Sequence, residues 1–169
     1  FKLAKNYFNI SLSINKNNPI TQNNLGLVLA HLNNELESIQ HFKKAKELDS
    51  EYKEPIYNLL EIYEKTNMLT ELKELVLFCL KKFKNNQIVK FYYALTLEKQ
   101  NHIKQAKTIL ENINFIEYSA DWDIKKTYQL GKINDALKNY PKAFSYFNKA
   151  NEKSLNLIGK NLLTNNIYM

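Results

Sequence analysis

Small and large side chains recur along this chain at a spacing of about 34 residues. A first column, in which neighbouring members are 34, 34 and 37 residues apart, holds Gly26, Leu60, Ala94 and Gly131. Twelve residues further along is a second column: Ala4 (from an earlier unit), Ser38, Leu72, Ala106 and Ala143. Four residues later come large apolar residues: Phe8, Phe42, Val76, Leu110 and Phe147. Columns that keep register over five units predict a stack of similar units.

Each unit has the pattern of two helices of about a dozen residues. Glycine and proline number only three each, too few for a many-turned β-sandwich. Polar breaks such as "LNNEL" (32–36) and "KNYPK" (138–142) separate the two apolar stretches of a unit. Pro141 falls in a first helical turn, where its missing N–H costs nothing. The sequence therefore predicts an all-α chain.

Gly131 interrupts an otherwise good helix, at a cost of roughly 1 kcal/mol relative to alanine. Paired helices approach closely where their facing residues are small. We expect Gly131 to face Ala143, and Gly26 to face Ser38, across such a contact. This predicts a packing role for the glycine and not a phosphate-binding loop.

The stretch "NNLGLVLAHLNNELESIQHFKKAKELD" (23–49) carries the resemblance to a known family. It resembles the tetratricopeptide repeat, with Leu-Gly at positions 7–8, a small residue at 20, an aromatic at 24 and Ala at 27. Position 4 departs from the pattern, and no unit has proline at position 32. The resemblance implies a right-handed superhelical solenoid of antiparallel helix pairs over residues 1–154.

The columns also predict the boundaries of the units. We expect the second helix of a truncated repeat at 1–18, followed by repeats at 19–52, 53–86, 87–123 and 124–154. The first unit lacks its first helix, so we expect the chain to be a piece of a longer protein. Residues 155–169 keep an apolar stripe at Leu155, Ile158 and Leu162, which predicts a capping helix or the start of a following region.

The register slips by three residues between Ile113 and Ile124. Trp122 lies in this stretch. A lone tryptophan at a repeat junction more often packs between the helices there than binds a ligand, so we expect the packing role. We expect Asp121 or Asp123 to cap the helix that begins here.

Charge and composition limit the classes of function. The net charge is +7, yet all 24 basic residues are lysine. Specific nucleic-acid sites depend on arginine, so we attribute the lysines to coding bias and expect no specific nucleic-acid binding. No apolar run approaches the roughly 18 residues of a membrane span. A single cysteine, Cys79, predicts a reducing, cytoplasmic location and suits a core position.

The residue types of catalysis do not fall into a site pattern. His31, His41 and His102 occupy unrelated repeat positions, and none has a partner at ligand spacing. No glycine-rich phosphate loop or nucleophile elbow is present in the sequence. We therefore expect a non-catalytic chain without metal or cofactor.

The resemblance implies a concave groove lined by positions 2, 5, 9 and 12 of the first helices. The groove residues would be Asn23, Leu27, Ala30, Tyr57, Glu61, Glu64, Phe91, Leu95, Glu98, Tyr128, Lys132 and Asp135. They would form an aromatic ladder with an acidic edge, suited to a peptide with an apolar anchor and a nearby Lys or Arg. The alternative is that tyrosine is ordinary at position 5 in this family and that the glutamates are merely solvated.

The resemblance thus predicts a protein- or peptide-binding scaffold. A narrower likeness offers an alternative function. "YQLGKINDALKNYPKAFSYFNKAN" (128–151) is similar to the last repeat ahead of the catalytic domain in bacterial repeat-containing sulfotransferases. That likeness would make this chain the accessory repeat region of such an enzyme, with no active-site residue of its own. The sequence names neither the partner nor the oligomeric state.

Overall fold

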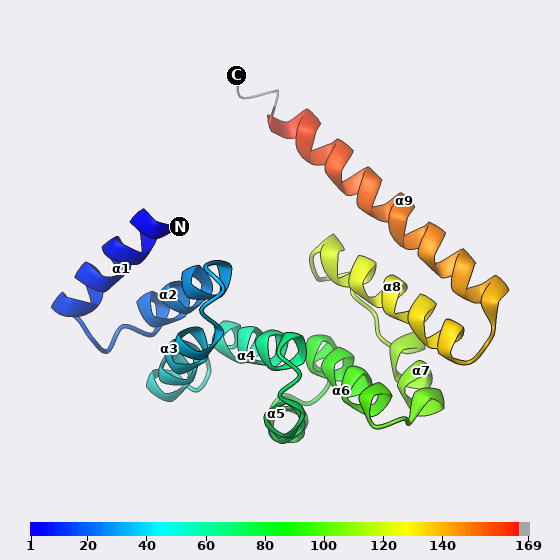
Figure 1. Ribbon diagram of the computed structural model, residues 1–169, viewed down its shortest axis with the longest axis horizontal. Helices are drawn as coiled ribbons and strands as arrows, with labels where there is room; N and C mark the ends of the chain where they lie inside the picture. Colours follow the sequence, from blue (N-terminus) through cyan, green and yellow to red (C-terminus); the bar gives the residue numbers. More distant parts are fainter. Residues whose placement is uncertain (166–169) are drawn as a thin grey trace. The chain divides into compact units, whose positions relative to one another are not determined.

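The computed structural model describes the backbone of residues 1–165 and the side chains of residues 1–159. Within this range the chain is all-α, as predicted, and contains no strand. The helices are α1 (Lys2–Ile14), α2 (Pro19–His31), α3 (Glu35–Leu48), α4 (Glu54–Lys65), α5 (Leu69–Lys82), α6 (Gln87–Lys99), α7 (Ile103–Glu111), α8 (Ala120–Ala136) and α9 (Tyr140–Asn165) (Figure 1). Among these helices, none has the length and apolar character needed to cross a membrane.

The helices form two compact units, Phe1–Phe78 and Cys79–Met169, with α5 running across the boundary. In the first unit α2 packs against α1, α3 and α4, and α3 also packs against α4. In the second unit α7 packs against both α6 and α8, and α8 pairs with α9 along much of its length. Within the units, α2 and α3 pack against each other as consecutive helices, and so do α8 and α9 (Figure 1).

One turn geometry recurs between the helices of a pair. A single residue with positive φ ends the first helix, and these residues are Asn33 (57°), Asn67 (58°), Asn101 (65°) and Lys138 (59°). The next residue donates its N–H to the carbonyl five residues back, at 2.9, 2.9, 2.8 and 2.8 Å in the four turns. This is the Schellman arrangement that terminates a helix. After glycine, asparagine is the residue that best tolerates the left-handed conformation it requires. The 34-residue repeat of the sequence is therefore also a repeat of backbone geometry.

The two glycines of the first column sit against the phenylalanines of the third column. A Cβ added to Gly26 would lie 2.6 Å from Cε1 of Phe42, and one added to Gly131 would lie 2.6 Å from Cε1 of Phe147. The hydroxyl of Ser38 donates a hydrogen bond of 2.7 Å to the Gly26 carbonyl. The predicted close approach of the paired helices is present. The need for glycine, however, comes mainly from the phenylalanine ring and less from the small residue of the second column.

The start of α8 differs from the prediction. Helix α8 begins at Ala120, with Ser119 at its N-cap and no side-chain cap bond, so neither Asp121 nor Asp123 is the cap. Both aspartates lie in the first turn, where the helix dipole favours negative charge.

Asp123 also joins α8 to α9. Its carboxylate forms ion pairs with the ammonium groups of Lys153 on α9 and of Lys126 on α8. The Lys126 Nζ lies 3.2 Å from Asp123 Oδ1. Burial acts to raise the pKa of Asp123, but the hydrogen bonds from Lys153 and Lys126 outweigh it and hold the pKa below its ordinary value.

Residues 155–165 continue α9 instead of forming a separate helix. Through residue 165 the chain therefore does not turn back over the last pair. Leu155 and Ile158, expected to cover that pair, are 69% and 53% exposed. The side chain of Leu162 and residues 166–169 lie outside the described part of the chain.

Candidate functional site

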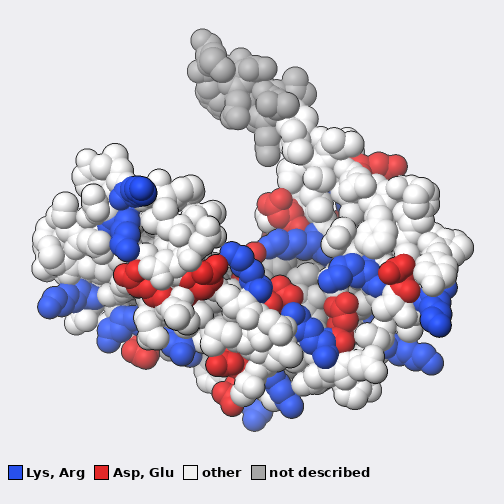
Figure 2. All heavy atoms as spheres, in the orientation of Figure 1, with Lys and Arg blue, Asp and Glu red and all other residues white. Residues whose placement is uncertain are grey.

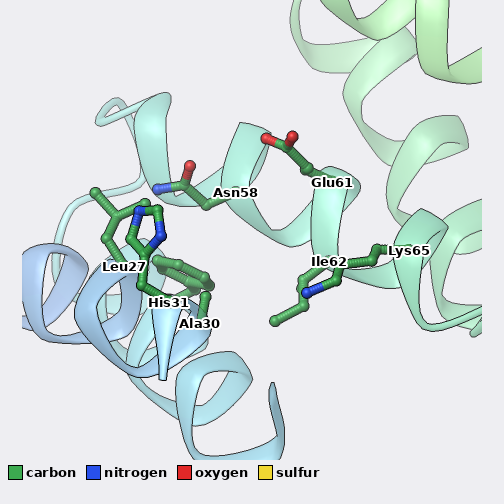
Figure 3. Close-up of a pocket in the computed structure, with 8 residues that line it drawn as sticks. Leu27, Ala30, His31, Asn58, Glu61, Ile62 and Lys65 are labelled. Atoms are coloured by element: carbon green, nitrogen blue, oxygen red, sulfur yellow. The ribbon is translucent and has the colours of Figure 1, made fainter. Parts of the chain in front are cut away.

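A pocket of about 230 Å³ opens between α2 and α4 in the first unit (Figure 3). Its apolar surface comes from Leu27 and Ala30 on α2, Phe42 on α3 and Ile62 on α4. Phe42 and Ile62 are buried, whereas Leu27 is 37% exposed. The pocket therefore has a buried apolar floor and an accessible apolar wall.

Polar side chains surround this apolar surface. His31 ends α2, and Asn58, Glu61 and Lys65 follow one another at helical spacing along α4 (Figure 3). The imidazole of His31 stacks on the ring of Phe1, with centroids 4.6 Å apart. Both charge signs are present at the rim, which suits polar groups flanking an apolar anchor.

Two hydrogen bonds hold the rim of the pocket in place. The amide of Asn58 donates to Oδ1 of Asn23 at 2.8 Å. The ammonium of Lys65 lies 3.4 Å from a carboxylate oxygen of Glu35 on α3. These partners belong to other helices of the unit, so the rim is fixed by the packing of α2, α3 and α4 together.

The predicted groove residues of the first unit divide into two groups. Leu27 and Glu61 line the pocket, as does Ala30. Asn23 is 3% exposed and is occupied by its bond to Asn58, so it is a structural residue and not an accessible ligand contact. Tyr57 and Glu64 are half-buried and lie outside the pocket lining.

In the second unit the structure buries the central member of the predicted ladder. Phe91 is 5% exposed, and its ring packs edge-on against Trp122 at 5.8 Å and Phe115 at 6.3 Å. Leu95, one turn further along α6, is 6% exposed. The three extra residues of this repeat and the early start of α8 bring these aromatic side chains onto α6. Phe91 and Leu95 are thus core residues, which corrects our expectation of an exposed aromatic ladder. Trp122 packs at the junction between the repeats, as predicted.

The remaining predicted residues of the second unit are more accessible. Tyr128 is 52% exposed, with its ring 5.3 Å from that of Phe147. Lys132 and Asp135 are exposed on α8. Glu98 is half-buried and accepts a hydrogen bond from the amide of Gln129. The structure places Glu98 on α6 and Tyr128, Lys132 and Asp135 on α8.

Comparison with known proteins assigns one segment of the chain to a known family. The family profile described as "Tetratricopeptide repeat" matches residues 21–52. Residues 21–52 are a tetratricopeptide repeat. The matched segment contains α3 and all but the first two residues of α2, and these helices carry one wall of the pocket.

Solved structures agree with this fold. YrrB, described as a TPR protein with an unusual peptide-binding site, superposes with a TM-score of 0.61 at 23% identity, over 86% of this chain and 74% of YrrB. MamA from Desulfovibrio magneticus RS-1 superposes with a TM-score of 0.69 at 16% identity, over 92% of this chain and 86% of MamA. A chain of the APC/C hetero-tetramer Cut9-Hcn1 gives 0.78 at 15% identity, over 90% of this chain and 30% of the other. A search of curated proteins finds no significant match.

Five lining residues were not among the predicted groove positions. They are His31, Phe42, Asn58, Ile62 and Lys65. Asn58 and Lys65 lie three residues before and four after Glu61, so helical spacing from a predicted residue would have found them. Phe42 was assigned to the core column, where it does belong, and it reaches the pocket floor only because Gly26 leaves room for its ring.

The described residues contain no group of three or more His, Cys, Asp or Glu side chains arranged to hold a metal ion. Cys79 is fully buried, as its core assignment predicts. On the face shown in Figure 2, lysines are interspersed with carboxylates in each unit. The α2–α4 pocket is therefore the candidate site with the clearest chemistry for binding.

Proposed function

We propose that this chain is a protein-binding scaffold whose α2–α4 pocket receives an apolar side chain of a partner peptide. Its tetratricopeptide-repeat fold is that of protein-interaction scaffolds, which supports the general function. The pocket is the single observation that carries the specific site.

The shape of the pocket supports an apolar anchor. Its floor is formed by buried side chains of Phe42 and Ile62, and the accessible wall is Leu27. An entering side chain would lose water on contact with both, at about 25 cal/mol per Å² of apolar surface removed from water. A leucine- or phenylalanine-sized residue suits a pocket of about 230 Å³ better than a polar one.

The rim supports a basic residue next to that anchor. Glu61 lies on the α4 edge, whereas the ammonium of Lys65 is directed to Glu35 on α3. A lysine or arginine of the partner beside the anchor would approach the Glu61 carboxylate, which favours it through charge complementarity. The Asn58 amide and the His31 ring offer hydrogen bonds to the partner backbone.

The experiment is a peptide-library selection against the whole chain, followed by affinity measurements on three variants. Leu27→Ala removes the accessible wall and is expected to weaken binding about tenfold, equivalent to about 1.4 kcal/mol. Glu61→Gln is expected to weaken binding of basic peptides severalfold, and less at high salt.

Leu36→Ala is the matched control, because Leu36 is 75% exposed on α3 and does not line the pocket. It is expected to leave affinity unchanged. Selected peptides that are acidic, or that bind Leu27→Ala as tightly as the parent chain, would contradict the proposal.

A further inference from the structure

The first unit has a second cleft, formed by α3, α4 and the first part of α5. Its volume is about 280 Å³, and it shares no residue with the α2–α4 pocket. Leu59 and Tyr63 of α4 form its floor together with Leu75 of α5, and all three are buried. The cleft therefore has an apolar base of its own.

The two walls of this cleft carry opposite charges. Lys43 and Lys46 project from α3, and Glu71 and Glu74 project from α5. Each pair is spaced by three residues, so its members share one face of their helix. Within the described residues no ion pair within 4.0 Å joins the two walls, although an ion pair on α3 links Lys44 and Glu47 outside the cleft. The charges across the cleft therefore remain available to a third group.

An exposed aromatic ring closes one end. Phe78 is 50% exposed, and the ammonium of Lys46 lies 5.9 Å from its ring centroid. At the floor, burial and then the nearby Glu71 carboxylate raise the pKa of the Tyr63 hydroxyl, so Tyr63 stays neutral beneath the charged walls. An apolar side chain entering here would contact Phe78 and Leu75.

We infer that the cleft is a second docking site, which takes an amphipathic helix of a partner protein. The acidic flank of that helix faces Lys43 and Lys46, its basic flank faces Glu71 and Glu74, and its apolar stripe covers Phe78. A helix presents charges at three- and four-residue spacing, which matches the spacing on both walls. A helix with one acidic and one basic flank satisfies both walls in only one direction, so the cleft also sets the orientation of the partner.

Three synthetic helical peptides with the same leucine stripe test this inference. One has an acidic and a basic flank, one has two acidic flanks and one has two basic flanks. Fluorescence anisotropy with the whole chain is expected to show that the mixed peptide binds at least about tenfold tighter than either uniform peptide, because each uniform peptide meets one wall of like charge.

Charge reversal sharpens the test. Lys43→Glu with Lys46→Glu makes both walls acidic, and the preferred peptide is expected to change to the one with two basic flanks. Phe78→Ala is expected to weaken the mixed peptide severalfold without changing the order of the three. Circular dichroism confirms that each variant keeps its helix content.

The matched control is Lys16→Glu with Lys44→Glu, which reverses two exposed lysines outside the cleft. It is expected to preserve the order of the three peptides, and so is Leu27→Ala in the other pocket. Equal binding of all three peptides, weak binding of all three, or an order that the Lys43/Lys46 reversal does not change would overturn the inference.

Discussion

The ring of Phe147 occupies the space that a side chain at position 131 would need. A Cβ on Gly131 would lie 2.6 Å from Cε1 of Phe147, closer than carbon atoms approach without repulsion. The same relation joins Gly26 to Phe42. In the repeat of α6 and α7 the corresponding residues are Ala94 and Leu110. Alanine is larger than glycine and leucine is smaller than phenylalanine, so the two columns compensate in size.

Gly131→Ala should therefore destabilise the second unit despite the better helix propensity of alanine. We expect a loss of about 1–3 kcal/mol from overpacking, reduced by up to about 1 kcal/mol of propensity. Urea unfolding followed by circular dichroism measures the change. Gly159→Ala is the control, because an added Cβ there meets nothing within 4 Å, and it should not destabilise the chain.

Adding Phe147→Leu to Gly131→Ala should recover part of the loss. The double variant reproduces the Ala94–Leu110 pair, in which both residues are fully buried. The two substitutions should then be less harmful together than the sum of their separate effects. Strictly additive losses would show that the two columns do not compensate each other.

Lys138→Asn should stabilise the turn between α8 and α9. Lys138 has φ of 59°, a conformation that costs most residues about 1 kcal/mol and that asparagine occupies in the three matching turns. We expect a gain of several tenths of a kcal/mol in the free energy of unfolding. Lys142→Asn in the exposed first turn of α9 is the control, and a gain of equal size there would contradict the turn explanation.

Phe91→Ala should act on folding and not on ligand affinity. Removing a buried aromatic side chain costs about 3–5 kcal/mol, and this ring packs on Trp122, the single tryptophan of the chain. The fluorescence of Trp122 should shift toward that of a solvated indole at lower denaturant concentration. Tyr128→Ala, at a 52% exposed position, should move the transition much less.

Asp123→Asn should destabilise the chain at neutral pH but not in acid. The folded state lowers the pKa of Asp123 through Lys153 and Lys126, so its stabilising effect is complete above the unfolded pKa of about 3.9. That effect disappears as the pH falls through the lower folded pKa. Denaturant unfolding should show a difference of at most about 1 kcal/mol at neutral pH, which closes once the pH is below the lowered folded-state pKa of Asp123. A difference that persists in acid would argue against the ion pairs.

The fold was largely predictable because its determinants are local and repeat. The spacing of Gly26, Gly131 and their partner columns fixed the helix pairs, and the polar breaks marked the turns. The apolar stripe after residue 154 predicted either a capping helix or the start of a following region, because a stripe does not say whether the chain turns back; in the structure residues 155–165 continue α9.

The site was less predictable than the fold. Leu27 and Glu61 were found from repeat position alone, since neighbouring repeats place them on one surface. Phe91 was misplaced because its burial depends on Trp122 and Phe115, which the irregular segment after α7 brings onto it. A position in a repeat predicts which way a side chain points, whereas exposure also depends on insertions in the next repeat.

The central claim is that the α2–α4 pocket binds the apolar anchor of a partner peptide. Methyl-labelled NMR spectra of the chain, titrated with a peptide from the library selection, test it most directly. We predict the largest shift changes at the methyl groups of Leu27 and Ile62, and loss of the Ile62 change in Leu27→Ala at the same peptide concentration. The methyl groups of Ile116, 86% exposed in the second unit, should not move. Shift changes that leave Leu27 and Ile62 unaffected while the peptide binds would contradict the account.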